Sequence, residues 1–274
     1  MYKKNESDLL RNIRVHNKLA KKYERMHGEI YNDFEQSRLR NELSEAISTI
    51  KTISQKKIAI DFGCGAGNLT RHLSNLGCDV IASDVSQGFL DLVASRSYDT
   101  NVSTIRLNGL DLKNIPNDCV DMVATYSVLH HLPDYISIFS EFMRVLKPGG
   151  VVYIDHELSE DFWSKSAAYL EFELKMKNKS KLNLRKYLIP KNYYDWLIRL
   201  FINPRYHREG DIHVFKDDHI EWNKISSNLI ALGGEVVYQK KYLLFRRNYD
   251  SLIFEAYKEK INDMHLLVAR KIYN

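Results

Sequence analysis

Three glycines and an acidic residue alternate with other residues near the start of the first apolar region of the chain. The segment reads Asp61-Phe-Gly63-Cys-Gly65-Ala-Gly67, and the apolar run at 57–62 that leads into it predicts a buried strand. Glycines at this spacing let the backbone turn tightly and let a ligand lie against it. The segment therefore predicts a ligand-binding loop between a strand and a helix.

A second acidic residue, Asp84, follows the next apolar run at 79–83. A carboxylate at the end of this strand can accept hydrogen bonds from both hydroxyls of a ribose. The loop and Asp84 together predict a cofactor that contains a nucleoside.

The loop does not fit a dinucleotide cofactor. The dinucleotide fingerprint needs a third small residue at position 68, where this chain has Asn68. The carboxylate of Asp61 would repel a pyrophosphate, whereas it suits a cofactor that carries an ammonium group. S-adenosylmethionine has an ammonium group, a sulfonium and a ribose but no phosphate, and it is therefore the cofactor that we expect.

The elements that position these residues are read from the alternation of apolar runs and helix-like segments. Strands are predicted at 57–62, 79–83, 102–107, 120–126 and 150–155, and helices around 67–76, 86–97 and 134–146. Strand, helix and strand at this spacing indicate parallel βαβ units with right-handed crossovers. We expect a doubly wound, Rossmann-like α/β fold.

The chain on either side of these units divides into further parts. Residues 1–53 are interpreted as an N-terminal helical cap, and 54–274 as one α/β domain with a helical lid insertion at about 157–210. The insertion is rich in aromatic residues and lysines, and it is too aromatic to remain unpacked. Beyond it the pattern predicts a helix near 217–232, a strand pair at 235–246, a short helix near 250–260 and a last strand at 265–271.

Composition excludes several classes of protein. The chain has 274 residues, a formal net charge of +5 and three cysteines. This mild charge does not favour nucleic acid as a partner, and an odd cysteine count without a C-x-x-C pair argues against disulfides or zinc. No apolar signal region or membrane-spanning run is present. We expect a cytoplasmic protein, with contact to a membrane surface left open.

Several ordered motifs between about 55 and 156 resemble the class I S-adenosylmethionine-dependent methyltransferase family, especially its ubiquinone-biosynthesis and natural-product members. The glycine loop and Asp84 match the family's cofactor loop and ribose acid. Further matches are Asp111-Leu112 before Ile-Pro, the run 120–126, the loop 127–134 and the turn 142–150. One glycine loop would be weak evidence, but several motifs in order are specific.

The resemblance implies a seven-stranded, mostly parallel sheet with an antiparallel last strand. It also implies an N-terminal helix that closes over the cofactor, with Tyr23, and less directly Gln36 or Arg38, as contributors. The cofactor-binding residues implied are Tyr23, Asp61, Gly63, Cys64, Gly65, Gly67, Asp84, Val85, Asp111, Leu112, Tyr126 and Ser127.

Candidate catalytic residues follow the fourth and fifth predicted strands. His131 matches the position that the family most often keeps near the cofactor methyl group, and His156 and Glu157 follow the fifth strand. Histidine suits proton removal near neutral pH, so His156 is predicted as the base, His131 as a positioning residue and Glu157 as an orienting group or alternative base. Adjacent histidines point in different directions, and no metal site is predicted.

These observations favour transfer of a methyl group from S-adenosylmethionine to a small molecule, with oxygen preferred over nitrogen as the acceptor atom. One alternative is a lipid-linked or phosphorylated acceptor at a membrane surface, and another is a non-catalytic scaffold. A nucleic-acid methyltransferase is disfavoured, because the Pro-Pro motif typical of amino-methylating members is absent at 125–131. The sequence does not indicate an oligomeric state.

Overall fold

A computed structural model describes residues 17, 27–132, 134–179 and 220–272 of the chain. Its centre is one seven-stranded sheet with the strand order β3-β2-β1-β4-β5-β7-β6. The strands are β1 (Ile58–Phe62), β2 (Asp79–Asp84), β3 (Val102–Arg106), β4 (Val120–Tyr126), β5 (Leu146–Leu158), β6 (Gly234–Tyr242) and β7 (Met264–Lys271).

The first five strands are parallel, and β7 is antiparallel to both of its neighbours. This confirms the predicted Rossmann-like sheet with an antiparallel last strand. The prediction of a strand pair at 235–246 is wrong, because only β6 forms there and the chain beyond Tyr242 leaves the sheet. β5 is also longer than predicted at both ends.

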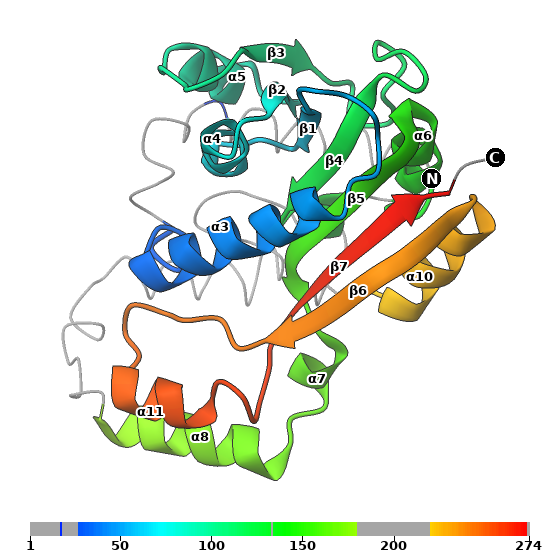
Figure 1. Cartoon of the computed structure of the whole chain (residues 1–274). Helices are drawn as coiled ribbons and strands as arrows, with labels where there is room; N and C mark the ends of the chain where they lie inside the picture. The colour runs from blue at the N-terminus through cyan, green and yellow to red at the C-terminus, as the bar shows by residue number, and fades with distance from the viewer. Residues whose placement is uncertain (1–16, 18–26, 133, 180–219, 273–274) are drawn as a thin grey trace, which may run out of the picture.

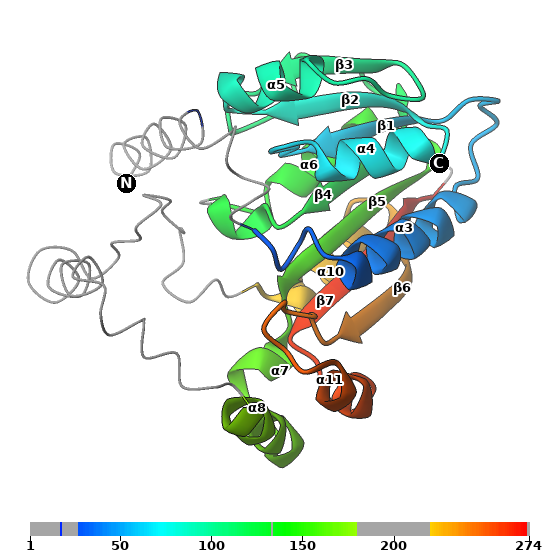
Figure 2. The ribbon, with the colours of Figure 1, turned by 90° about the vertical axis from the view of Figure 1, so that its left-hand side faces the viewer.

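Helices cover both faces of the sheet (Figures 1 and 2). One face packs against α3, α4 and α5, and the other packs against α6 and α10. A further pair, α8 and α11, packs together below the sheet around its own apolar cluster. The bounds are α3 (Asp33–Ser48), α4 (Asn68–Asn75), α5 (Gln87–Ala94), α6 (Ile138–Val145), α7 (Glu160–Trp163), α8 (Ala167–Lys179), α10 (Trp222–Ala231) and α11 (Ser251–Tyr257), with the 3-10 turn η2 (Leu129–His131).

Helix α3 lies in the described part of the predicted N-terminal cap. It begins after Asn32, whose side chain accepts a hydrogen bond from the backbone of Glu35, as a helix cap does. Its Leu39, Leu43 and Ala46 are buried against the sheet at helical spacing. Tyr23 lies outside the described residues.

The predicted insertion at 157–210 is described only as far as α8. It begins inside β5 and continues through α7 and α8, while 180–210 lies outside the described residues. Across the described ranges, no helix combines the length and the apolar character needed to cross a membrane.

Candidate active site

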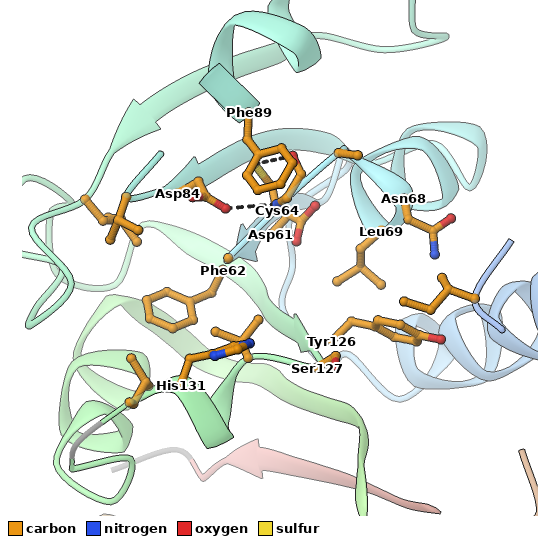
Figure 3. A pocket seen from close by; sticks show the side chains of 18 of the residues that line it. Asp61, Phe62, Cys64, Asn68, Leu69, Asp84, Phe89, Tyr126, Ser127 and His131 are labelled. Carbon is orange, nitrogen blue, oxygen red and sulfur yellow. Dashed lines mark hydrogen bonds between the residues drawn. The ribbon is translucent and has the colours of Figure 1, made fainter. Parts of the chain in front are cut away.

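A pocket opens where β1, β2 and β4 end at their carboxyl edge (Figure 3). Its walls are formed by the loop 61–66 and by the segments 84–85, 126–128 and 131–132. Residues 30–31, which precede α3, close one side of the pocket. The chain runs from β1 to β2 on one side and later returns to β4 on the other. The pocket therefore lies at the switch point where open α/β sheets bind ligands.

The glycine loop takes a backbone shape that other residues would strain. Gly63 has φ 75° and Gly67 has φ 79°, both in the left-handed region. A Cβ atom on Gly63 would lie 2.6 Å from a methyl group of Val128, so the loop and the end of β4 can approach only because this side chain is absent. Gly67 does not line the pocket, because it ends the loop as the N-cap of α4.

Asp84 is held at the end of β2 by two backbone amides. Gly65 N donates to its Oδ2 at 2.9 Å, and Ser86 N donates to its Oδ1 at 2.7 Å. The side chain is buried and lines the pocket. Its carboxylate is thus fixed beside the glycine loop, at the place predicted for a ribose acid.

Asp61 is the second carboxylate of the pocket, at the end of β1. It is 1% exposed, and burial raises the pKa of its carboxyl to about 7. Hydrogen bonds from Thr70 oppose this rise in pKa, including one from Thr70 Oγ1 to Oδ2 at 2.5 Å, while the charge of Asp84 adds to it. A cation beside Asp61 would favour the ionised carboxylate.

The charge of the pocket matches S-adenosylmethionine. Asp61 and Asp84 both line it, and the lining residues that the structure describes include no lysine or arginine. Such a wall suits an ammonium group and ribose hydroxyls, and it would repel a pyrophosphate. The residues present therefore fit this cofactor.

Four more of the predicted cofactor-binding residues line the same pocket: Cys64, Val85, Tyr126 and Ser127. Burial holds the pKa of the Cys64 thiol well above its ordinary value, which disfavours the thiolate that a nucleophile needs. Ser127 has φ 61°, which places the end of β4 in the left-handed region. Strained residues of this kind cluster at functional sites.

Asp111 and Leu112 lie outside the pocket wall. They line a neighbouring hollow that shares Leu107 with the pocket. Asp111 pairs with Lys113 at 2.9 Å and accepts a hydrogen bond from Asn108 at 3.0 Å, while Leu112 is buried in the main core. Both lie next to the cofactor pocket without contacting it.

A β-bulge redirects the end of β5. Between Ile154 and Glu157 the register against β7 shifts, and His156 has φ 62°. Glu157 consequently points at the loop after β4 and accepts hydrogen bonds from the backbone amides of Val128 and Leu129, at 2.8 and 2.7 Å, and from the ring of His130, at 2.8 Å. Bulges next to active sites often redirect side chains in this way.

The two candidate histidines occupy different places. His131 lines the pocket, and its ring lies 4.1 Å from that of His130. His156 does not line it: its ring stacks on Tyr126 at 4.5 Å, and both ring nitrogens are buried without a hydrogen-bond partner in the described part of the chain. Burial lowers the pKa of His156 to about 4, so the ring is neutral and weakly basic. The bulge turns the ring of His156 onto Tyr126 and away from the described wall of this pocket.

Arg38 contacts the protein rather than the pocket. Its guanidinium pairs with Asp155 at 3.0 Å and with Glu35 at 2.8 Å, and it lies 3.8 Å over the ring of Tyr242. Tyr242 and Tyr153 also donate hydrogen bonds to Asp155, at 2.8 and 2.6 Å. This buried network ties α3 to β5 and β6.

Some pocket residues were not predicted from the sequence. Asn68 was noted only as a break in the dinucleotide fingerprint, yet it lines the pocket beside Leu69. Phe89 of α5 and Ile30 lie in the wall as well. Their position in the first turn of a helix or just ahead of one is the available signal in the sequence, because ligands of this fold bind at such junctions.

Comparisons with known proteins agree with this geometry. Residues 60–154 match the family model described as a methyltransferase domain. The chain is 23% identical to a ubiquinone biosynthesis O-methyltransferase of Photorhabdus laumondii over 153 residues, which are 55% of this chain and 64% of that protein. It is 28% identical to a demethylmenaquinone methyltransferase of Bacillus subtilis over 189 residues, 67% of this chain and 77% of that protein. The chain thus spans less than two thirds of the Photorhabdus relative.

The fold is also found in solved structures. A crystal structure of an S-adenosylmethionine-dependent methyltransferase from Mesorhizobium loti superposes with a TM-score of 0.52 at 18% sequence identity, covering 83% of this chain and 96% of that one. The family model lies on the strands and loops that build the pocket, from β1 to β5. Residues 60–154 thus match a methyltransferase domain model, and in this region the chain is similar to S-adenosylmethionine-dependent methyltransferases in sequence and in fold.

Proposed function

We propose that this protein transfers a methyl group from S-adenosylmethionine to a small-molecule acceptor. The observation that carries the proposal is the pocket with two buried carboxylates, Asp61 and Asp84, at the switch point of a methyltransferase domain. When bound, S-adenosylmethionine supplies a methyl group activated by its sulfonium. The protein then has to hold the acceptor in line and exclude water.

Each carboxylate has a distinct proposed task. Asp84, fixed by two backbone amides, would accept hydrogen bonds from the ribose hydroxyls. Asp61 would face the ammonium group, whose charge favours the ionised carboxylate. The glycine loop, Val85, Tyr126 and Ser127 would form the remaining contact surface. Asp111 and Leu112 would need the loop at 107–115 to move before they could touch the adenine.

The acceptor side is proposed around the loop after β4. His131 lies in the pocket wall with Leu132 and Val128, so a hydroxyl seated there is within reach of an imidazole. We therefore assign proton removal to His131 rather than His156. Glu157 would orient the loop through its three hydrogen bonds, and His156 would support Tyr126 from behind.

An oxygen acceptor on a quinone-like or aromatic molecule is the acceptor class that we favour. A relative is named for O-methylation in ubiquinone biosynthesis, and another is named for methylation of demethylmenaquinone. The pocket wall also offers Ile30, Leu132 and Tyr126, which suit an apolar ring.

The division of the chain remains part of the proposal. Residues 1–53 would form a cap, and about 157–210 a lid over the acceptor. Hydrogen exchange of α7 and α8 should slow when S-adenosylhomocysteine and an acceptor are both bound, as for active-site lids. Unchanged exchange throughout 160–179 would count against the lid.

The activity is tested by binding first and transfer second. Calorimetry should show S-adenosylmethionine binding, whereas a scaffold need not bind and NAD should not compete. Transfer of a labelled methyl group to a panel of catechols, hydroxyquinones and amines then identifies the acceptor atom. Tighter binding of NAD than of S-adenosylmethionine would refute the cofactor assignment.

A further inference from the structure

Asn68 places an unused donor in the pocket wall. It is the first residue of α4, is 7% exposed and lines the pocket (Figure 3). Its Nδ2 is buried and has no hydrogen-bond partner among the described residues. A buried amide nitrogen without a partner is costly, so a native structure that keeps one calls for a ligand or water there.

The orientation of this amide is fixed by its neighbours. Gln36 Nε2 donates to Asn68 Oδ1 at 3.0 Å, and Arg71 Nη2 approaches the same oxygen at 3.4 Å. Both neighbours are donors, so the reversed amide would set its own N–H groups against theirs. Asn68 must therefore keep its oxygen toward Gln36 and its nitrogen on the other side.

Gln36 is in turn fully engaged. Its Nε2 also donates to the carbonyl oxygen of Ile30 at 3.0 Å, and its Oε1 accepts from Arg71 Nη2 and from His72 Nε2, both at 2.9 Å. Burial lowers the pKa of His72 to about 4, so the ring is neutral and its Nε2 carries the hydrogen. With these four partners the Gln36 amide has a single orientation. Its Nε2 therefore faces Asn68 and fixes the orientation of the Asn68 amide.

The N-terminus of α4 adds to the attraction for a negative group. This eight-residue helix begins at Gly67, which supplies no side-chain cap, and its first turn holds no acidic residue. The helix end therefore keeps its partial positive charge. Asn68 Nδ2 and this helix end lie in the same wall as the carboxylate of Asp61.

We propose that Asn68, oriented by Gln36, binds the carboxylate of the aminoacyl part of the cofactor, while Asp61 faces its ammonium group. The inference rests on the proposed function and deepens it. One acceptor and one donor in the same wall match the two ends of an α-amino acid. Among the described lining residues there is no lysine or arginine that could compete for this carboxylate, and Arg71 points its guanidinium at Gln36.

The substrate and the product of the reaction carry the same aminoacyl group. Asn68 should therefore bind both equally, which raises KM on substitution and leaves kcat at saturating cofactor nearly unchanged. A residue that only supported the fold of the loop would not produce this split.

The test compares ligands with and without the carboxylate in calorimetry on the full chain. Asn68→Ala should bind S-adenosylhomocysteine about tenfold to a hundredfold more weakly than the parent protein, the range for a hydrogen bond to a charged group. It should bind decarboxylated S-adenosylmethionine and methylthioadenosine, which both lack the carboxylate, as the parent does. Asn68→Asp should lose more than Asn68→Ala, because it sets two carboxylates together. Asn68→Ser serves if the alanine variant fails to fold.

Two further variants test whether Gln36 acts by orienting the amide of Asn68. Gln36→Ala should weaken S-adenosylhomocysteine binding by a smaller factor than Asn68→Ala and should spare methylthioadenosine. Asn75→Ala, at the exposed far end of α4, is the matched control and should change nothing. The inference would be overturned if Asn68→Ala lost the same affinity for all three ligands, or lost no affinity for S-adenosylhomocysteine. Either result would leave the proposed function standing. A parent protein that binds none of the ligands would overturn both.

Discussion

The buried carboxyl group of Asp61 should make cofactor binding depend on pH. Its pKa in the ligand-free protein is raised to about 7, mainly because burial disfavours the charged form. The proposed ammonium partner favours the charged form, so binding lowers this pKa. Below pH 7 the carboxyl is mostly protonated, and binding must release that proton. Affinity is therefore fully present above about pH 8 and falls as the pH drops through 7.

The size of the effect follows from the raised pKa. Each pH unit below 7 should weaken binding about tenfold, so the dissociation constant should rise about tenfold at pH 6 and about a hundredfold at pH 5. Calorimetry in buffers of different ionisation enthalpy should count about one proton released per ligand near pH 6. Circular dichroism over the same range checks that the protein stays folded.

Two variants connect the effect to this one side chain. Asp61→Asn should bind the cofactor weakly, and its affinity should not change as the pH passes through 7. Thr70→Ala should raise the pH at which the affinity begins to fall, because the hydrogen bond from Thr70 Oγ1 lowers the pKa of Asp61 in the parent protein. An affinity that stays constant between about pH 5.5 and 8 in the parent protein would refute the assignment of Asp61 to the ammonium group.

Three other predictions concern the pocket and the residues that support it. Asp84→Ala should weaken S-adenosylmethionine binding by about 1.5–3 kcal/mol for each ribose hydrogen bond lost, and calorimetry showing equal affinity would exclude that role. Glu157→Gln should lower the free energy of unfolding by about 1–3 kcal/mol in urea titrations, because an amide cannot accept from all three of its donors. His131→Ala should cut turnover about a hundredfold or more in labelled-methyl assays, while His156→Ala should cost less than about tenfold; the reverse order would restore His156 as the base.

The cofactor half of the site could be predicted from the sequence because its signals are local. Gly63 and Gly65 follow a buried strand directly, and Asp84 ends the next strand, so each residue's position depends only on its own element. Parallel pairing then brings the ends of β1 and β2 together, with Asp61 opposite Ala82. Continuous apolar runs, which mark strands buried on both faces, and the glycine spacing are sufficient to predict this arrangement.

The direction of His156 could not be predicted, because it depends on the bulge. Strict alternation along β5 would put His156 on the face of Ile154, which packs with α6, and opposite to the face of Tyr153, which packs with α3. The register shift and the positive φ instead stack His156 on Tyr126, a residue of the α3 face. Bulges of this kind often carry glycine, and a histidine gives no such signal in sequence.

The contacts of helix α3 are a second feature that could not be predicted from the sequence. Gln36 and Arg38 are polar positions on a mostly polar helix, and in sequence they resemble a solvated face. In the structure they reach Asn68 and Asp155, which lie 32 and 117 residues further along the chain. One helix thus fixes a donor in the proposed cofactor site and the start of the β5 bulge that supports Tyr126 and the loop of His131. Helix α3 is therefore a structural part of the site rather than a cover added to a finished domain.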